Sequence, residues 1–117
     1  MVAPNGNSTT ISKTNGRNLL FSFEQMLAHH TVGGCSFNVG DFLGSGTISG
    51  TQAGERGSLL EANENGTVSI KLDGDDKRTF LEDGDEVTLR ACCGEEGMLV
   101  GFGDCVGQIE PAVKLQY

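Results

Sequence analysis

The sequence predicts a mainly β fold, a β-sandwich roll with one short helix near the N-terminus. Two observations favour this class. Apolar residues alternate with polar ones over residues 67–72 and 86–91, a period of two that is typical of half-buried strands. Residues 22–34 carry instead the start and stop signals of a helix. A length of 117 residues suits a single domain of this kind.

The N-terminal segment, residues 1–10, is polar, contains Pro, Gly and Asn and shows no periodicity, so we expect a flexible lead-in. The domain itself is expected to occupy residues 11–113, followed by a tail of residues 114–117. Its first element is predicted to be a short strand over residues 11–15, which ends at the turn signal Asn15-Gly16.

The helix is predicted to run from about Phe23 to Val32. Ser22 and Gln25 have the spacing of a capping box, in which each side chain satisfies a backbone N–H of the other residue. Apolar residues then recur at spacings of three and four, which gives the helix one apolar face. The pair Gly33-Gly34 is expected to end it.

The remainder of the chain is predicted to be sheet. Asp73-Gly74 indicates a hairpin between strands over residues 67–72 and 78–81. Gly-Asp pairs precede two more strands, one beginning at Phe42-Leu43 and one at Glu86-Val87. Further short strands are expected over residues 98–102 and 105–109.

Composition excludes some classes of function. The net charge is −8, from 16 acidic and 8 basic residues, so the chain repels phosphate backbones and we expect no nucleic-acid partner. No segment approaches the roughly 20 apolar residues of a membrane span, and the N-terminus lacks the layout of a signal peptide, so we expect a cytoplasmic protein. With 18 glycines and no Trp, the core is expected to be thin and some apolar surface to need a partner.

The four cysteines do not indicate a metal site. They include the adjacent pair Cys92-Cys93 but no C-x-x-C spacing that begins a zinc site. We expect reduced thiols packed as small apolar groups at Cys35, Cys92, Cys93 and Cys105.

The most informative segment is the glycine-rich stretch from Gly44 to Glu61. Glycine allows a ligand to approach the backbone closely, so the stretch suggests a site built from main chain. Its G-x-G-x-x-x-G spacing misses the dinucleotide pattern by one residue and lacks the Lys of a P-loop, which disfavours nucleotide binding. Two interpretations stay open: a small-molecule contact through Thr47 Oγ1, or a glycine-rich β-bend without a ligand.

Glu61 also has two interpretations. It follows Leu59-Leu60, so its carboxylate can face a pocket and orient a His or a water molecule. If the segment is a strand, Glu61 instead points to solvent on the face opposite Leu60, and the pattern alone slightly favours that arrangement.

Other candidate residues have structural explanations. Neighbouring helical side chains diverge by about 100°, so His29 and His30 do not bind one ion together. His30 is expected to be a packed, hydrogen-bonded core histidine and His29 to lie nearer solvent. The acidic runs over residues 73–77 and 82–86 depart from the EF-hand pattern and are expected to be solvated turns.

Five blocks stand in order and at consistent spacing along the chain: His29 to Cys35, Gly40 to Gly50, Gly57 to Glu61, Phe80 to Val87 and Gly101 to Gly107. Taken together, they give the chain a strong resemblance to the C-terminal part of the fumarylacetoacetase family. The resemblance covers about residues 11–113.

The resemblance implies hydrolysis of the carbon–carbon bond of 4-fumarylacetoacetate, a β-diketone, to fumarate and acetoacetate, the last step of tyrosine and phenylalanine breakdown. It implies a homodimer that depends on Ca²⁺ or Mg²⁺, with a β-sandwich roll at the C-terminal end. In the family a His takes a proton from water and a Glu orients that His. By motif, Glu61 matches this Glu, and Thr47 matches a Thr that contacts substrate.

Some of the family's functional residues do not match this chain. The catalytic His, the carboxylate metal ligands and the site's Lys and Arg lie upstream of the matched part, so we expect the 117 residues to be inactive alone. His29 and His30 match a different pair of histidines in the family. Gly33 stands where Asn is usual, and Val39 replaces a frequent Pro. The alternative function is a non-catalytic β-module that pairs with itself or with a full-length subunit.

Overall fold

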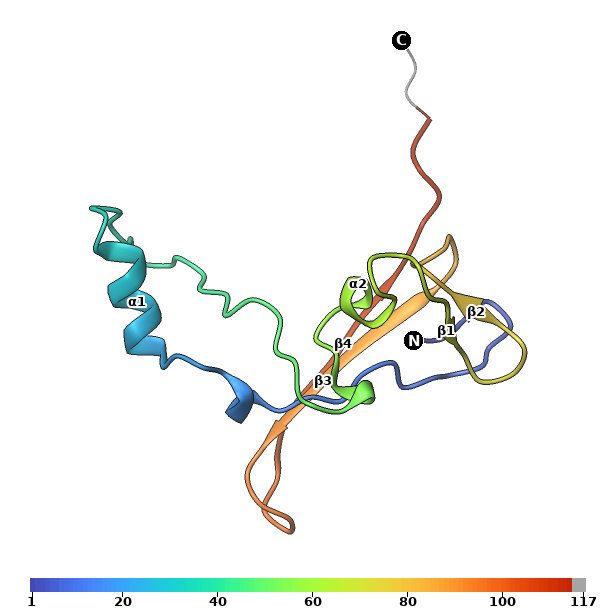
Figure 1. Ribbon diagram of the computed structural model, residues 1–117, viewed down its shortest axis with the longest axis horizontal. Helices are drawn as coiled ribbons and strands as arrows, with labels where there is room; N and C mark the ends of the chain where they lie inside the picture. The colour runs from blue at the N-terminus through green and yellow to red at the C-terminus, as the bar shows by residue number, and fades with distance from the viewer. Residues whose placement is uncertain (115–117) are drawn as a thin grey trace. The chain divides into compact units, whose positions relative to one another are not determined.

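The computed structural model describes residues 1–114, so all but the first residue of the predicted tail lies outside the described residues. The chain forms two compact units. One comprises Ser12–Ala62, and the other comprises Met1–Ile11 together with the chain from Asn63 onward. The first holds the helices and the second holds the strands (Figure 1).

The predicted helix is confirmed as α1, Phe23–Thr31. Its capping box is complete: the Gln25 N–H donates to Ser22 Oγ at 3.3 Å, and the Ser22 N–H donates to Gln25 Oε1 at 2.8 Å. Gly34 follows the helix with φ +88°, a left-handed conformation that stops helices at little cost for glycine. Local sequence signals therefore determine both ends of α1.

Three shorter helical elements complete this unit: the 3₁₀ turns η1 (Gly16–Asn18) and η2 (Ala53–Glu55), and the single turn α2 (Leu59–Ala62). The strands predicted over residues 11–15 and at Phe42-Leu43 are wrong, because the structure has no strand there. A strand needs a neighbour along its whole length. Here Lys13 donates a single backbone hydrogen bond, to the carbonyl of Gly54 in η2 at 2.9 Å.

In the other unit, the hairpin predicted at Asp73-Gly74 is confirmed. β1 (Ile70–Lys71) and β2 (Lys77–Arg78) pair antiparallel, with Ile70 opposite Arg78. Both strands are shorter than the predicted segments. The Leu72 N–H donates to the Asp76 carbonyl at 3.0 Å and closes the connecting turn.

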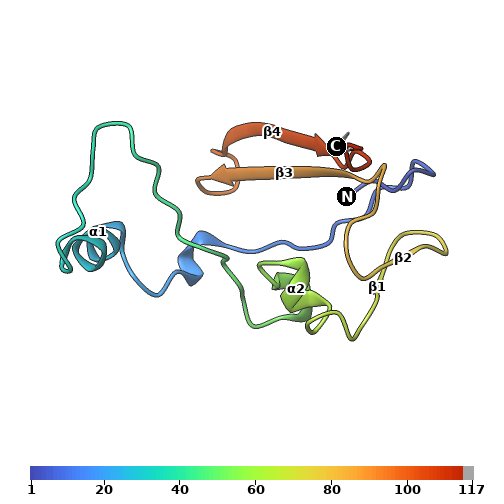
Figure 2. The ribbon, with the colours of Figure 1, turned by 90° about the horizontal axis from the view of Figure 1, so that it is seen from above.

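A longer hairpin follows, in which β3 (Glu86–Cys93) pairs antiparallel with β4 (Val100–Gln108). The two strands run side by side with a register shift between Arg90 and Cys92 (Figure 2). The strands predicted over residues 98–102 and 105–109 are thus parts of one strand, because the ladder continues across the predicted break.

The fold class is confirmed only in its coarse form. The described residues form a few short helices and two separate two-stranded antiparallel sheets, without the predicted β-sandwich roll. A two-stranded hairpin cannot by itself enclose a core. Every residue of β4 is accordingly exposed, and Phe102 retains 72% of its accessible surface. The expected thin core is confirmed: the buried apolar residues of the described chain are Ala3 and Leu72.

The interior of the strand-bearing unit is mainly polar, with Asn63, Arg78 and Asp85 buried. The N-terminal residues attach to it: the Val2 N–H donates to the Glu86 carbonyl at 2.8 Å, and the Glu86 N–H returns a bond to Val2 at 2.9 Å. Flexibility of residues 1–10 remains a prediction.

Candidate functional site

Glu61 lies in α2 rather than in a strand, so the structure corrects the strand-based interpretation of its environment. Ser58 caps this turn: its Oγ accepts the Glu61 N–H at 3.2 Å, and its carbonyl accepts the Ala62 N–H at 3.0 Å. Ser58 and Glu61 have the S-x-x-E spacing of a capping box. That signal predicts a helical turn here, and the apolar step Leu59-Leu60 obscured it.

The Glu61 carboxylate is held by three donors from the same glycine-rich stretch. Ser49 Oγ donates to Oε2 at 2.5 Å, and the Gly57 N–H donates to the same oxygen at 3.1 Å. Arg56 Nη1 approaches Oε1 at a longer 3.4 Å. Motif matching singled out Glu61, but no local pattern indicates that Ser49 would reach it across 12 residues.

These contacts favour the ionised form of Glu61. The Ser49 hydroxyl is the main cause that holds the pKa of the Glu61 carboxyl below its usual value, and the Gly57 N–H and Arg56 lower it further. The group is therefore an anion at neutral pH and acts as a hydrogen-bond acceptor. Its side chain keeps 37% of its accessible surface, so a further donor can still reach it.

Close approaches between chain segments explain two of the glycines. A Cβ added to Gly57 would lie 2.8 Å from the Ile48 carbonyl oxygen, and a Cβ added to Gly50 would lie 2.0 Å from Glu55 Oε2. A side chain at Gly57 would push two backbone segments apart, whereas at Gly50 the close neighbour is the Glu55 side chain. At both positions the close neighbour is protein, so a ligand site built from this main chain stays a prediction.

Thr47 lies on the segment that these contacts hold. Its neighbour Ile48 abuts Gly57, and Ser49, two residues on, bonds to Glu61. The Thr47 side chain is itself exposed and so accessible to a ligand. Thr47 and Glu61 are therefore linked within one unit by the Ile48–Gly57 approach and the Ser49–Glu61 hydrogen bond.

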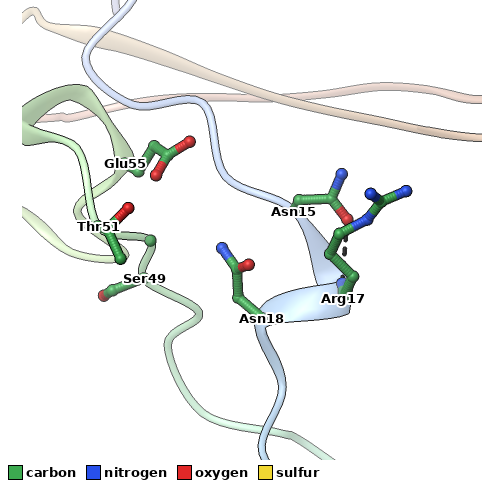
Figure 3. Close-up of a pocket in the computed structure, with 7 residues that line it drawn as sticks. Asn15, Arg17, Asn18, Ser49, Thr51 and Glu55 are labelled. Atoms are coloured by element: carbon green, nitrogen blue, oxygen red, sulfur yellow. Dashed lines mark hydrogen bonds between the residues drawn. The ribbon is translucent and has the colours of Figure 1, made fainter.

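A polar pocket of about 560 Å³ lies beside this segment and is lined by Asn15, Arg17, Asn18, Ser49, Gly50, Thr51 and Glu55. Figure 3 shows η1 on one side and the loop with Ser49 and Thr51 on the other, with Asn18 directed between them. The Arg17 N–H donates to Asn15 Oδ1 at 3.0 Å and fixes the start of η1. Neither Thr47 nor Glu61 lines this pocket.

The histidine and cysteine predictions need correction. His30 is exposed and not a core residue; its ring contacts Phe37 with centroids 4.5 Å apart. His29 is exposed, as expected. All four cysteines are free, as predicted, but they are exposed rather than packed. Three of them lie on the β3–β4 hairpin, whose shape leaves its side chains uncovered.

The prediction that the acidic runs are solvated turns is wrong at Asp85, which is fully buried. Asp76 accepts a hydrogen bond from Asn5 Nδ2, and Asp85 pairs with Arg78. Among residues 1–114, no three His, Cys, Asp or Glu side chains gather into a set that would hold a metal ion. The described residues therefore do not by themselves fit a Ca²⁺ or Mg²⁺ site, which requires several oxygen ligands.

Comparison with known proteins places the chain in a family. The family described as "Fumarylacetoacetate (FAA) hydrolase C-terminal" matches residues 2–110, nearly the whole sequence. The chain belongs to the fumarylacetoacetate hydrolase family and corresponds to its C-terminal portion.

Among individual relatives, fumarylacetoacetase of Aspergillus fumigatus is 59% identical over 112 residues, which cover 96% of this chain and 26% of that protein. The enzyme of Emericella nidulans is 57% identical, with 94% and 25% covered. That of Caenorhabditis elegans is 43% identical, with 95% and 27% covered. The chain thus spans about a quarter of the length of the curated relatives it matches.

The described part of the chain contains no helix whose length and apolar character would let it cross a membrane.

Proposed function

We propose that this chain is part of a fumarylacetoacetase, which hydrolyses 4-fumarylacetoacetate to fumarate and acetoacetate in tyrosine and phenylalanine breakdown. Glu61 and Thr47 are its contribution to the active site. The observation that carries the proposal is the Glu61 carboxylate, which accepts hydrogen bonds from Ser49 and Gly57 and lies beside Arg56, in a chain 59% identical to a fumarylacetoacetase.

Glu61 acts as an acceptor for the imidazole of a histidine from elsewhere in the complete enzyme. Oε2 already receives two hydrogen bonds, whereas Oε1 has the single long contact to Arg56. Oε1 is therefore the oxygen with room for an imidazole N–H. A carboxylate in that position fixes the tautomer and orientation of the ring and stabilises the imidazolium that forms when the ring takes a proton from water.

Thr47 contacts the substrate. Its exposed hydroxyl donates to a carbonyl or carboxylate oxygen of the β-diketone acid, and the Ile48–Gly57 and Ser49–Glu61 contacts keep it in register with Glu61. Binding and proton transfer are then positioned by one packed stretch of chain.

The family implies Ca²⁺ or Mg²⁺, whose chemistry would be to hold the diketone oxygens and stabilise the enolate of the departing acetoacetate. The resemblance sets the carboxylate ligands upstream of the part that this chain matches, and no three acidic, His or Cys side chains within residues 1–114 gather into a set that would hold a metal ion. We therefore place the metal ligands in other parts of the complete enzyme.

The remaining features of the proposed enzyme are a homodimer, a cytoplasmic location and a C-terminal β-sandwich roll formed within residues 11–113. The four free cysteines support a reducing compartment. The uncovered side chains of β3 and β4 support a fold that further chain or a second subunit completes.

The test uses the complete enzyme and follows the loss of 4-fumarylacetoacetate by absorbance. Glu61→Gln is expected to lower kcat by roughly 10²–10⁴, the range for acid–base groups and the partners that orient them. Glu64→Gln, an exposed glutamate three residues on, is the matched control and should leave kcat unchanged. Normal turnover by Glu61→Gln would remove this residue from the mechanism.

A second arm tests Thr47 and the chain alone. Thr47→Val should lower kcat/KM roughly tenfold, because one hydrogen bond to substrate is lost at constant volume. The 117-residue chain with substrate and Mg²⁺ should show no turnover. Steady hydrolysis by the chain alone would refute our assignment of the histidine and the metal ligands to other parts of the enzyme.

A further inference from the structure

We propose that Ser49 is the positioning residue for Glu61, an inference that rests on the proposed function. Its hydroxyl fixes the rotation of the carboxylate, so that Oε2 faces the glycine-rich loop and Oε1 faces the reacting histidine.

The geometry leaves the Ser49 hydroxyl one consistent arrangement. Ser49 Oγ accepts the Gly57 N–H at 3.0 Å, so its own proton is directed to Glu61 Oε2 at 2.5 Å. The Gly57 N–H is shared with Oε2 at 3.1 Å. Three groups thus form a closed cycle in which every donor has an acceptor, and rotating the carboxylate would break two of the bonds.

Arg56 does not perform this role. Its guanidinium lies 3.4 Å from Oε1, and the two side chains are 42% and 37% exposed, so the ion pair is weak and screened by solvent. A long side chain in solvent also holds a partner less rigidly than a hydroxyl on a packed segment. Ser49 is half-buried on such a segment, beside the Ile48–Gly57 contact.

Ser49 also lies close in sequence to Thr47, the proposed substrate contact. It lies two residues after Thr47, so a single segment carries both the residue that touches substrate and the residue that aims Glu61. A change at Ser49 is therefore expected to act on turnover more than on substrate affinity, because it leaves the Thr47 hydroxyl in place.

The experiment compares Ser49→Ala and Ser49→Thr in the complete enzyme. Ser49→Ala should lower kcat by roughly 10–100-fold, as losing the partner that orients an active-site group does, with KM changed much less. Ser49→Thr retains the hydroxyl and should restore most of the loss. Ser45→Ala is the matched control, because the Ser45 hydroxyl bonds to the adjacent Gly46 carbonyl.

The pH profile supplies a readout that a purely structural role would not move. Without the Ser49 hydroxyl the Glu61 carboxylate loses its main stabilising donor and becomes more basic. The acid limb of kcat, which belongs to the histidine and Glu61 together, should move to higher pH in Ser49→Ala and stay in place in Ser49→Thr.

A double mutant separates this proposal from the one it rests on. Adding Ser49→Ala to Glu61→Gln should cause no further loss of kcat if Ser49 acts through Glu61. A full additional loss in the double mutant overturns the role of Ser49, and so does a Ser49→Ala enzyme with normal kcat and an unmoved acid limb. In either case, a low kcat of Glu61→Gln still supports the proposed function. Normal turnover by Glu61→Gln overturns both.

Discussion

Arg78 and Asp85 form a two-pronged ion pair in the interior of the strand-bearing unit. Arg78 Nε lies 2.9 Å from Asp85 Oδ2, and Nη2 lies 3.0 Å from Oδ1. Asp85 is fully buried and Arg78 is 8% exposed. The Glu82 N–H donates to the same carboxylate at 2.9 Å, so the pair ties the end of β2 to the turn before β3.

Asp85→Asn is expected to destabilise the chain by about 3–5 kcal/mol, because it removes the buried partner of the Arg78 guanidinium. The countercharge that remains, the Glu82 carboxylate at 3.5 Å, is exposed and screened by solvent. Urea unfolding followed by circular dichroism measures the change. The matched control is Asp104→Asn, which breaks the Arg90–Asp104 pair of similar length, 2.8 Å, on the exposed β3–β4 hairpin. Equal losses from the two substitutions would contradict the importance of burial.

Stability is expected to fall in acid through the same pair. The Arg78 guanidinium is the main cause that lowers the pKa of Asp85 in the folded chain. A lowered folded pKa means that the contribution is complete above the unfolded value, about 3.9, and is lost as pH falls from there through the folded pKa. Unfolding measured at steps between neutral pH and the acid range should show the decline, and Asp85→Asn should flatten it. An unchanged slope in the variant would assign acid sensitivity to other groups.

Asn63 is the second polar residue on which this unit depends. It is fully buried; its Oδ1 accepts the Gly66 N–H at 2.8 Å, and its Nδ2 donates to the Thr79 carbonyl. Asn63→Ala should cost about 1–3 kcal/mol, because both partners lose a bond in the interior. Asn65→Gly, at an exposed position with φ +58° that glycine adopts freely, is the control and should change the free energy of unfolding little. Similar losses from both variants would argue against the buried amide.

The elements that sequence predicted well are those specified by neighbouring residues. The capping box at Ser22 and the turn at Asp73-Gly74 place α1 and the first hairpin correctly, because both signals act over a few residues. The same kind of signal is present at Ser58, where the apolar pair Leu59-Leu60 favoured a strand instead.

Features that depend on distant partners were not predictable. The described residues form no sandwich; alternation along β3 indicates a face to be covered but does not say what covers it. The exposed His30 has the same explanation: its place on the apolar face of α1 predicts burial but does not say which segment covers that face. At the candidate site, motif resemblance suggests Thr47 and Glu61, which stay predictions, whereas the Ser49–Glu61 contact depends on how the loop between those two residues folds back.

Gly57→Ala is expected to disturb the candidate site through its backbone. The added Cβ would lie 2.8–2.9 Å from three backbone atoms of Ile48, so the segment that carries Thr47 and Ser49 must shift. Such overpacking typically costs about 1–3 kcal/mol. A shift of that segment also lengthens the Ser49–Glu61 bond, so kcat of the complete enzyme should fall together with stability. Gly54→Ala, in the same loop with open space around its Cβ, should leave both unchanged. Thermal unfolding and turnover measured on the two variants check this prediction. If the Gly57→Ala enzyme is as stable and active as Gly54→Ala, the Ile48–Gly57 approach does not hold the segment with Thr47 and Ser49 against the segment with Glu61.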